Sequence, residues 1–359
     1  MDLLSANAAR AYAWTLTLAF GACVPDVDTD DATVTGPSLL AIQAEPAEAK
    51  VGEQVVYRGL FKDTSGGTPA GRLSWFYCSA RKPAAELGPV SRDCFDAESD
   101  QLHRIGNDLE VQGTMPIDGC SLFGPNPPLQ TDKDAPAGRP ADPDPTGGYK
   151  QPVIVGVAPA QGKGGTVLYE QRLLCGLAGV SPKVSGDFNQ RYRRNVNPRI
   201  DGLDAARESG ARVSLADGEV LSARAGETLA LTARWPSCPR EGEAMCGDGI
   251  CGIDELSAEC KDDCAKAVPP GCAGQEDYLW LDVQEGQLGT RHESISVAWY
   301  ATAGVYADER TGVPEAERSD HTSNEWTAPH QAGEVTLWTV IRDSRGGVGF
   351  REIKVNVGP

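Results

Sequence analysis

The chain has 359 residues and carries 33 basic against 51 acidic side chains, a formal net charge of −18. A chain this acidic is repelled by nucleic-acid phosphates, which excludes a DNA- or RNA-binding protein. No apolar run reaches the roughly 18 residues that a membrane-spanning helix needs, and the length suits two domains of about 100–200 residues each.

The N-terminal segment has the pattern of an export signal. Residues 11–22 form a short apolar run that follows Arg10 and ends in small residues just before Cys23. A charged start, an apolar stretch of about 7–15 residues and a small-residue cleavage site are typical of secretory signal peptides. We therefore predict a signal peptide over residues 1–22, followed over residues 23–36 by an acidic, flexible tether.

The end of this segment, Phe20-Gly21-Ala22-Cys23, resembles the bacterial lipobox. The resemblance implies that Cys23 becomes the lipidated first residue of the mature protein. It also implies an anchor in outer-membrane lipid, on the periplasmic or the surface face, because Val24 and not Asp follows the cysteine. The alternative is an ordinary cleaved signal peptide followed by a cysteine without this role.

The cysteine count agrees with export. Ten of the 11 cysteines remain when Cys23 is set aside, an even number that would form five disulfides outside the cytoplasm. In a cytosolic protein the same residues would indicate metal binding instead. Spacing alone leaves the pairing open, and our working assignment is Cys78–Cys94, Cys120–Cys175, Cys238–Cys272, Cys246–Cys260 and Cys251–Cys264.

One strand pattern occurs in both halves of the chain. Residues 49–53 and residues 223–227 each combine a basic residue with Gly-Glu, and each is followed by apolar residues at alternate positions. Gly-Glu indicates a turn, and the alternation indicates a half-buried strand. The alternating residues are Val55, Tyr57, Gly59 and Phe61 in the first half, and Leu229, Leu231, Ala233 and Trp235 in the second.

Later strands follow in the same order. Residues 73–78 match residues 295–300 as an aromatic-bearing strand, and residues 167–175 match residues 335–343 as a late strand. Residues 343–347 are a glycine-containing turn before the last strand. In that strand three apolar residues alternate with polar ones, as in an antiparallel sheet with one wet face: Ile353, Val355 and Val357.

Short alternating strands, turns rich in Gly and Pro and a buried Trp in each half predict an all-β protein. We expect two tandem Ig-like antiparallel β-sandwiches, over residues 37–192 and 193–359. Residues 116–152 should form a surface loop, because Pro blocks both a helix and a central strand. A small disulfide-rich insertion, residues 238–272, interrupts the second sandwich.

The junction between the two halves holds one basic cluster, made of Arg191, Arg193, Arg194 and Arg199. These arginines could contact lipid phosphates or an acidic polymer. We favour pairing with the acidic surfaces of the domains themselves.

The chain resembles uncharacterised Ig-like surface lipoproteins of large-genome, gliding Gram-negative bacteria. The resemblance rests on the Gly-Glu strand starts, on Asn197-Pro198 and on residues 296–304, 326–329 and 337–347. It covers most of the chain and implies the same sandwich fold and surface location. It implies no particular activity.

The insertion contains the segment CGDGICGIDELSAECKDDC, residues 246–264, which resembles a CGDGxC…CxxDC module of secreted bacterial proteins. A segment this short has no core of its own, so two disulfides would stabilise it. Its acids Asp248, Glu255 and Asp263 lie near glycines that free backbone carbonyls, a combination suited to Ca²⁺. The alternatives are a disulfide-stapled loop with solvated acids and zinc held by four thiolates; no other cofactor is expected.

No catalytic constellation is complete. Residues 63–67 lack the His and Asp partners of a serine nucleophile, and residues 162–165 lack the spacing of a phosphate loop. The four histidines show no paired-ligand spacing, so we expect surface or lightly buried positions for His103, His292, His321 and His330. We therefore expect no enzymatic activity.

The leading functional hypothesis is a non-enzymatic, lipid-anchored cell-surface protein that displays Ig-like domains for binding or structural roles in the envelope. Its partner would be an unknown surface protein or polysaccharide. The alternative is a carbohydrate-binding or accessory module of an envelope or secreted hydrolase system. That alternative predicts an exposed line of aromatics, for which the candidates are Trp280, Trp326 and Trp338, although Trp338 sits in an alternating strand where a core position is expected.

Overall fold

The computed structural model describes residues 32–82, 87–124, 145–160, 164–216, 218–243, 245–256, 259–264 and 270–359. The predicted signal peptide, Cys23 and most of the predicted tether lie outside the described residues. None of the helices in the described part of the chain is long and apolar enough to cross a membrane.

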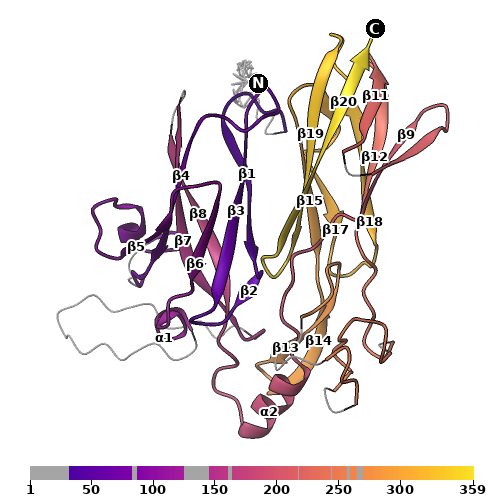
Figure 1. The fold of residues 1–359 in the computed structure, drawn as a ribbon. Coiled ribbons are helices and arrows are strands. Elements are labelled where there is room, and N and C mark those ends of the chain that lie inside the picture. Colours follow the sequence, from indigo (N-terminus) through magenta and orange to yellow (C-terminus); the bar gives the residue numbers. More distant parts are fainter. Residues whose placement is uncertain are drawn as a thin grey trace, which may run out of the picture. The chain divides into compact units, whose positions relative to one another are not determined.

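The first half folds as a sandwich of two sheets (Figure 1), with strand orders β1-β3-β6 and β2-β8-β7-β4-β5. Its strands are β1 (Ser38–Glu45), β2 (Glu48–Ala49), β3 (Gln54–Lys62), β4 (Gly71–Cys78), β5 (Leu102–Gly106), β6 (Glu110–Thr114), β7 (Gly148–Pro159) and β8 (Gly165–Leu174). The helical segments are a 3₁₀ turn, η1 (Arg92–Phe95), and two helices, α1 (Gly119–Phe123) and α2 (Pro182–Arg191).

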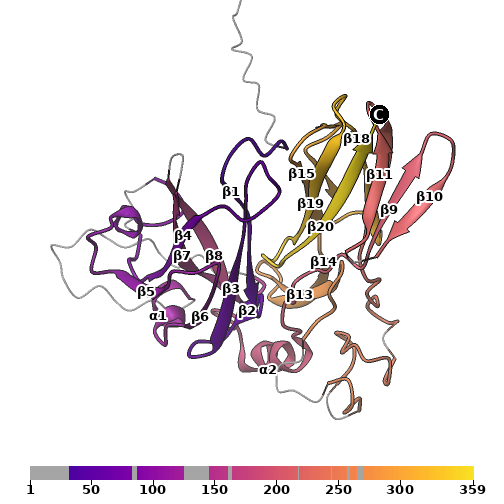
Figure 2. The same cartoon turned by 45° about the horizontal axis from the view of Figure 1, so that its top comes forward.

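The second half is a larger sandwich, with strand orders β10-β9-β12-β18-β16 and β11-β20-β19-β15-β17, plus the hairpin β13-β14. Its strands are β9 (Gly202–Arg207), β10 (Arg212–Leu215), β11 (Val220–Arg224), β12 (Thr228–Arg234), β13 (Asp277–Asp282), β14 (Gln287–His292), β15 (Ile295–Ala301), β16 (Val305–Tyr306), β17 (Arg310–Val313), β18 (His321–Thr327), β19 (Gly333–Asp343) and β20 (Val348–Gly358). Figure 2 shows α2 beside the β13-β14 hairpin, against which it packs through Phe188 and Leu279.

Both sandwiches have the strand order of an Ig fold. In each, a short strand pairs in parallel with the last strand, β2 with β8 and β11 with β20, while the remaining pairings are antiparallel. Each also buries a tryptophan on the corresponding central strand, Trp75 in β4 and Trp299 in β15, the position at which Ig domains carry theirs. The predicted all-β fold of two sandwiches, with the disulfide cluster in the second, is confirmed.

The alternating residues identified in the sequence form the cores. Val55, Tyr57 and Phe61 are buried in β3, and Leu229 and Leu231 are buried in β12, because successive side chains of a strand point to opposite faces. In the last strand, β20, the three predicted residues are buried and those between them are exposed.

The predicted loop over residues 116–152 is wrong at both ends. The helix α1 lies within it, and β7 begins at Gly148 and carries Pro152 between β4 and β8. The sheet tolerates this proline because the pairing of β7 with β4 stops at Val153. The side-chain amide of Gln151 then donates to the carbonyl of Cys78 at 2.7 Å, in place of a backbone donor.

Because β7 was not predicted, the predicted match between residues 167–175 and residues 335–343 is displaced by one strand. Residues 167–175 belong to β8, the last strand of the first sandwich, whereas residues 335–343 belong to β19, the penultimate strand of the second. The counterpart of β19 is β7, and the counterpart of β8 is β20.

The two sandwiches share an apolar cluster. Leu40 and Ala41 of β1 and Leu60 of β3 are buried with residues of the second sandwich: Ala298, Trp338, Val340 and Val348. At its edge, Lys62 pairs with Glu352 at 2.7 Å, and Glu352 also accepts from the indole of Trp338 at 2.9 Å.

Candidate functional site: the cysteine-rich insertion and the linker

The cysteine-rich insertion follows β12 of the second sandwich and ends before the β13-β14 hairpin. Its described residues form no helix or strand, so disulfides take the place of a core. Cys238–Cys272 closes its base, and Cys246–Cys260 and Cys251–Cys264 brace its interior. Together with Cys78–Cys94 and Cys120–Cys175, these are the five pairs of our working assignment.

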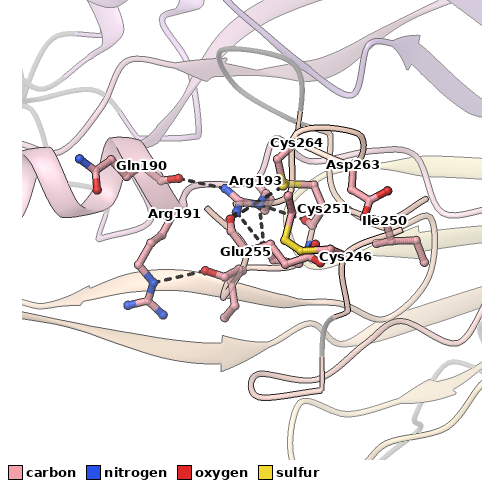
Figure 3. The surroundings of a disulfide bond; sticks show 12 residues. Gln190, Arg191, Arg193, Cys246, Ile250, Cys251, Glu255, Asp263 and Cys264 are labelled. Carbon is pink, nitrogen blue, oxygen red and sulfur yellow. Dashed lines mark hydrogen bonds between the residues drawn. A yellow bond between two sulfur atoms is a disulfide. The ribbon is translucent and has the colours of Figure 1, made fainter. Parts of the chain in front are cut away.

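The insertion encloses the side chain of Arg193, which lies just after α2 in the linker between the two sandwiches, residues 191–202 (Figure 3). Arg193 is 3% exposed. Its Nε donates to the carbonyls of Cys251 at 3.0 Å and Gly252 at 2.9 Å. Its Nη2 donates to the carbonyl of Gly252 at 2.7 Å and to that of Glu255.

The remaining nitrogen of Arg193, Nη1, turns back to the linker. It donates to the carbonyls of Gln190 and Tyr192, both at 3.2 Å. Burial lowers the pKa of the guanidinium to about 10, while the charge of Glu255 opposes the change. Arg193 is therefore a cation at neutral pH, held by backbone carbonyls.

Glu255 lies at the centre of the insertion and is buried. Its Oε2 accepts from the backbone N–H of Gly252 at 2.8 Å. Its Oε1 is buried without a hydrogen-bond partner among the described residues. A carboxylate oxygen of Glu255 lies within 4.8 Å of the sulfurs of both inner disulfides.

The three acids predicted as calcium ligands do not share one donor group in the described residues. The donor groups that include Glu255 combine it with disulfide-bonded cysteines and include neither Asp248 nor Asp263. Asp248 accepts from the backbone N–H of Ile250 at 2.8 Å. Asp263 accepts from the backbone of Gly249 at 3.0 Å and from that of Gly247.

The two hydrogen bonds that Asp263 accepts stabilise a turn. Gly247 and Gly249 have φ of 95° and 85°, a conformation that favours glycine. Asp263 thus closes the turn that these two glycines make, and its carboxylate oxygens are engaged by backbone donors.

The expected pairing of the linker arginines with acids is confirmed for three of the four. Arg191 lies 3.1 Å from Glu241, and Arg199 pairs with Asp201. Arg194 donates to Glu53 of the first sandwich at 2.9 Å. Arg193 is the exception, because its hydrogen bonds go to carbonyls.

A buried charge network adjoins the linker, and no sequence pattern predicted it. Its centre is Glu48 in β2, which is fully buried. Glu48 accepts from Arg172 at 3.0 Å, from the hydroxyl of Tyr192 at 2.6 Å and from the backbone N–H of Asn195 at 3.0 Å. Burial alone would raise the pKa of the Glu48 carboxyl, but the charges of Arg172 and Arg345 and these hydrogen bonds hold that pKa below its ordinary value.

Arg345 extends this network into the second sandwich. It belongs to the turn between β19 and β20 that the sequence marks as a simple hairpin turn, yet it is buried. It donates to Glu293 at 2.7 Å and to Glu276. It also donates to the carbonyl of Arg193 at 3.3 Å, which links the network to the residue held by the insertion.

A second polar cluster lies at the base of the insertion. His292, predicted to lie on or near the surface, is buried, and its Nδ1 donates to Asp277 at 2.7 Å. Arg318 donates to the same carboxylate at 2.7 Å, and the backbone N–H of Glu241 donates to it at 2.9 Å. His292 and Arg318 line a cavity of about 470 Å³.

Asp277→Asn should weaken the fold most at neutral pH. Burial alone would raise the pKa of Asp277, but the hydrogen bond from His292 and its other donors hold the pKa below its ordinary value. A depressed pKa stabilises the fold above the unfolded pKa of about 3.9, and that stability is lost as the pH falls through the folded pKa. Urea unfolding should therefore show a loss of about 2–3 kcal/mol at pH 7 that shrinks below about pH 4.

Asp262→Asn is the matched control, because Asp262 is exposed. Its unfolding free energy should follow that of the unaltered protein across the pH range. A loss at Asp277→Asn that stays constant down to acid pH would contradict the assignment.

The predicted line of exposed aromatics is wrong. Trp326 and Trp338 are fully buried in β18 and β19. Trp280 is half-buried, and the guanidinium carbon of Arg291 lies 4.1 Å from its ring centre. These side chains therefore offer no continuous aromatic surface to a sugar.

The comparisons with known proteins identify no family. Neither a protein-family model nor a curated protein matches the sequence. Among solved structures, fibronectin(III)-like modules of Clostridium thermocellum CbhA align at 8% identity and a TM-score of 0.18, over 88% of this chain and 94% of that one. The Yersinia pseudotuberculosis adhesin InvE aligns at 10% identity and a TM-score of 0.20, over 88% of this chain and 58% of that one.

The C-terminal domain of the Streptococcus pyogenes antigen I/II-family protein AspA aligns at 9% identity and a TM-score of 0.20, over 90% of this chain and all of that one. Scores this low carry no inference about the function of the present chain.

Proposed function

We propose that the chain is a non-catalytic envelope protein whose two Ig-like sandwiches act as one stiff scaffold for binding or structural roles. The observation that carries the proposal is the junction. An apolar cluster and a buried charge network both join residues of the two sandwiches. Ig-like scaffolds carry their binding residues in loops, so a stiff junction would keep the loops of the two sandwiches at fixed relative positions.

Export is supported by the disulfides. All ten cysteines beyond Cys23 are paired, and stable disulfides form in oxidising compartments outside the cytoplasm. Two of the pairs brace a segment without helix or strand, which reduction would leave without a core.

The lipid anchor and the binding partner are the more specific parts of the proposal. Cys23 would carry the lipid, and residues 24–36 would hold the sandwiches away from the outer membrane. The partner would be a surface protein or polysaccharide reached by the loops. These assignments rest on the sequence pattern.

Incorporation of labelled palmitate tests the anchor in a Gram-negative host that expresses the full chain. We expect label in the unaltered protein, recovered with outer membranes, and none in Cys23→Ser. Secretion of the unlabelled, soluble and fully disulfide-bonded protein would overturn the lipid anchor and leave export standing. Free thiols throughout the purified protein would overturn export itself.

A further inference from the structure

We propose that the turn formed by residues 251–255 of the cysteine-rich insertion is a guanidinium receptor, and that Arg193 is its ligand, supplied by the same chain. Three carbonyls of the turn accept hydrogen bonds from one side chain, those of Cys251, Gly252 and Glu255. Figure 3 shows this side chain pointing into the loop that carries them.

The acceptors are arranged by the insertion's own bonds. The backbone N–H of Glu255 donates to the carbonyl of Gly252 at 3.1 Å, while the N–H of Gly252 donates to the Glu255 side chain at 2.8 Å. The Cys251–Cys264 disulfide holds the first residue of the turn. The turn thus has a geometry of its own to which a ligand can bind.

The charge of the insertion favours a cationic ligand. Residues 245–264 include six acidic side chains against one basic, Lys261. Burial and the charge of Arg191 lower the pKa of Arg193, while the carboxylates of Glu255 and Asp254 raise it.

The shape of the receptor favours guanidinium over other cations. A guanidinium presents several N–H donors in one plane, so a single group can satisfy several carbonyls, whereas an ammonium is a compact point charge. Ca²⁺ takes six to eight oxygens, and the turn offers three carbonyls beside Glu255.

Binding of this ligand connects the insertion to the junction. The side chain of Arg193 is held by the insertion, and its backbone carbonyl accepts from Arg345 of the buried network. The insertion therefore holds the linker from one side while the charge network holds it from the other.

Chemical rescue of Arg193→Ala tests the receptor, with the melting temperature of the purified, oxidised protein as the measurement. We expect the variant to melt about 5 °C or more below the unaltered protein. Millimolar methylguanidinium should restore most of that loss in the variant and leave the unaltered protein unchanged. Methylammonium, urea and Ca²⁺ should restore none of it.

Two further variants serve as controls. Arg191→Ala removes a neighbouring arginine that pairs with Glu241, and it should lose little and show no response to methylguanidinium. Arg193→Lys keeps the charge but not the planar set of donors, and it should melt below the unaltered protein. Equal rescue by methylammonium, greater rescue by Ca²⁺, or no rescue by methylguanidinium would each overturn the proposal.

A measurement on the unaltered protein covers the case in which Arg193→Ala is not recovered folded. The Nε–H of Arg193, observed by NMR in ¹⁵N-labelled protein, should exchange slowly with solvent. It should exchange rapidly once the disulfides have been reduced. Rapid exchange in the oxidised protein would overturn the receptor.

Discussion

Glu48→Ala is expected to lower the free energy of unfolding by about 3–5 kcal/mol, because removing one partner of a buried ion pair leaves the other charge uncompensated. Arg172 loses its carboxylate at a position where it is itself buried, and Tyr192 and Asn195 lose their acceptor. Equilibrium unfolding in urea with the disulfides intact measures the loss. Calorimetry should show one transition for the unaltered protein and two for the variant, because Glu48 joins the first sandwich to the linker.

Glu170→Ala is the matched control for Glu48→Ala. Glu170 pairs with Lys150 at 2.9 Å, but Lys150 is exposed and Glu170 is partly exposed, and such surface pairs contribute under about 1 kcal/mol. If the two variants lose equal stability, the junction network does not hold the sandwiches together.

Trp326→Ala is expected to cost about 3–5 kcal/mol, the usual loss when a buried aromatic leaves a cavity. Trp326 is fully buried in the core of the second sandwich, and its indole N–H donates to the carbonyl of Ala303 at 3.2 Å. The space around it is closed, since a Cβ added at Gly304 would lie 2.5 Å from its indole nitrogen. The same unfolding measurement gives the loss.

Trp280→Ala provides the comparison for Trp326→Ala. Trp280 is half-buried beneath Arg291, so its loss should be about 1 kcal/mol, the scale of a partly exposed cation–π contact. A small loss at Trp326 would mean that this side chain is accessible, and would restore it as a candidate ligand-binding aromatic.

The strands were predictable from the sequence wherever one of their two faces is exposed to solvent. In β3 and β20 apolar and polar residues alternate, and this period-2 pattern places the buried face directly. β7 escaped prediction because it lies at the interior of a sheet and carries Pro152, which the sequence marks as a breaker. The compensating bond from Gln151 to Cys78 joins residues 73 positions apart and leaves no local signal.

The sequence predicted the disulfides better than it predicted the buried charge network. The even number of cysteines beyond Cys23 predicted disulfides, and although spacing left the pairing open, the structure joins the five pairs of the working assignment. Glu48 and Arg345 are charged residues next to turns, which are usually solvated. Their partners include residues far away in the sequence, such as Arg172 for Glu48 and Glu293 for Arg345, and no spacing rule reports such contacts.

The receptor for Arg193 had one signal in the sequence. A cluster of four arginines in the linker precedes an insertion with a large excess of acids. That juxtaposition predicts attraction between the two segments. It does not reveal that backbone carbonyls, rather than carboxylates, take the central arginine.

The contact between β1 and β20 has a consequence for the newly made chain. Gln43 donates to the carbonyl of Val348, a residue 305 positions later. Until β19 and β20 have packed against it, the first sandwich exposes Leu40, Ala41 and Leu60 to water. A chain truncated before β19 would leave this apolar face permanently exposed. Incomplete products would therefore be prone to aggregation and proteolysis.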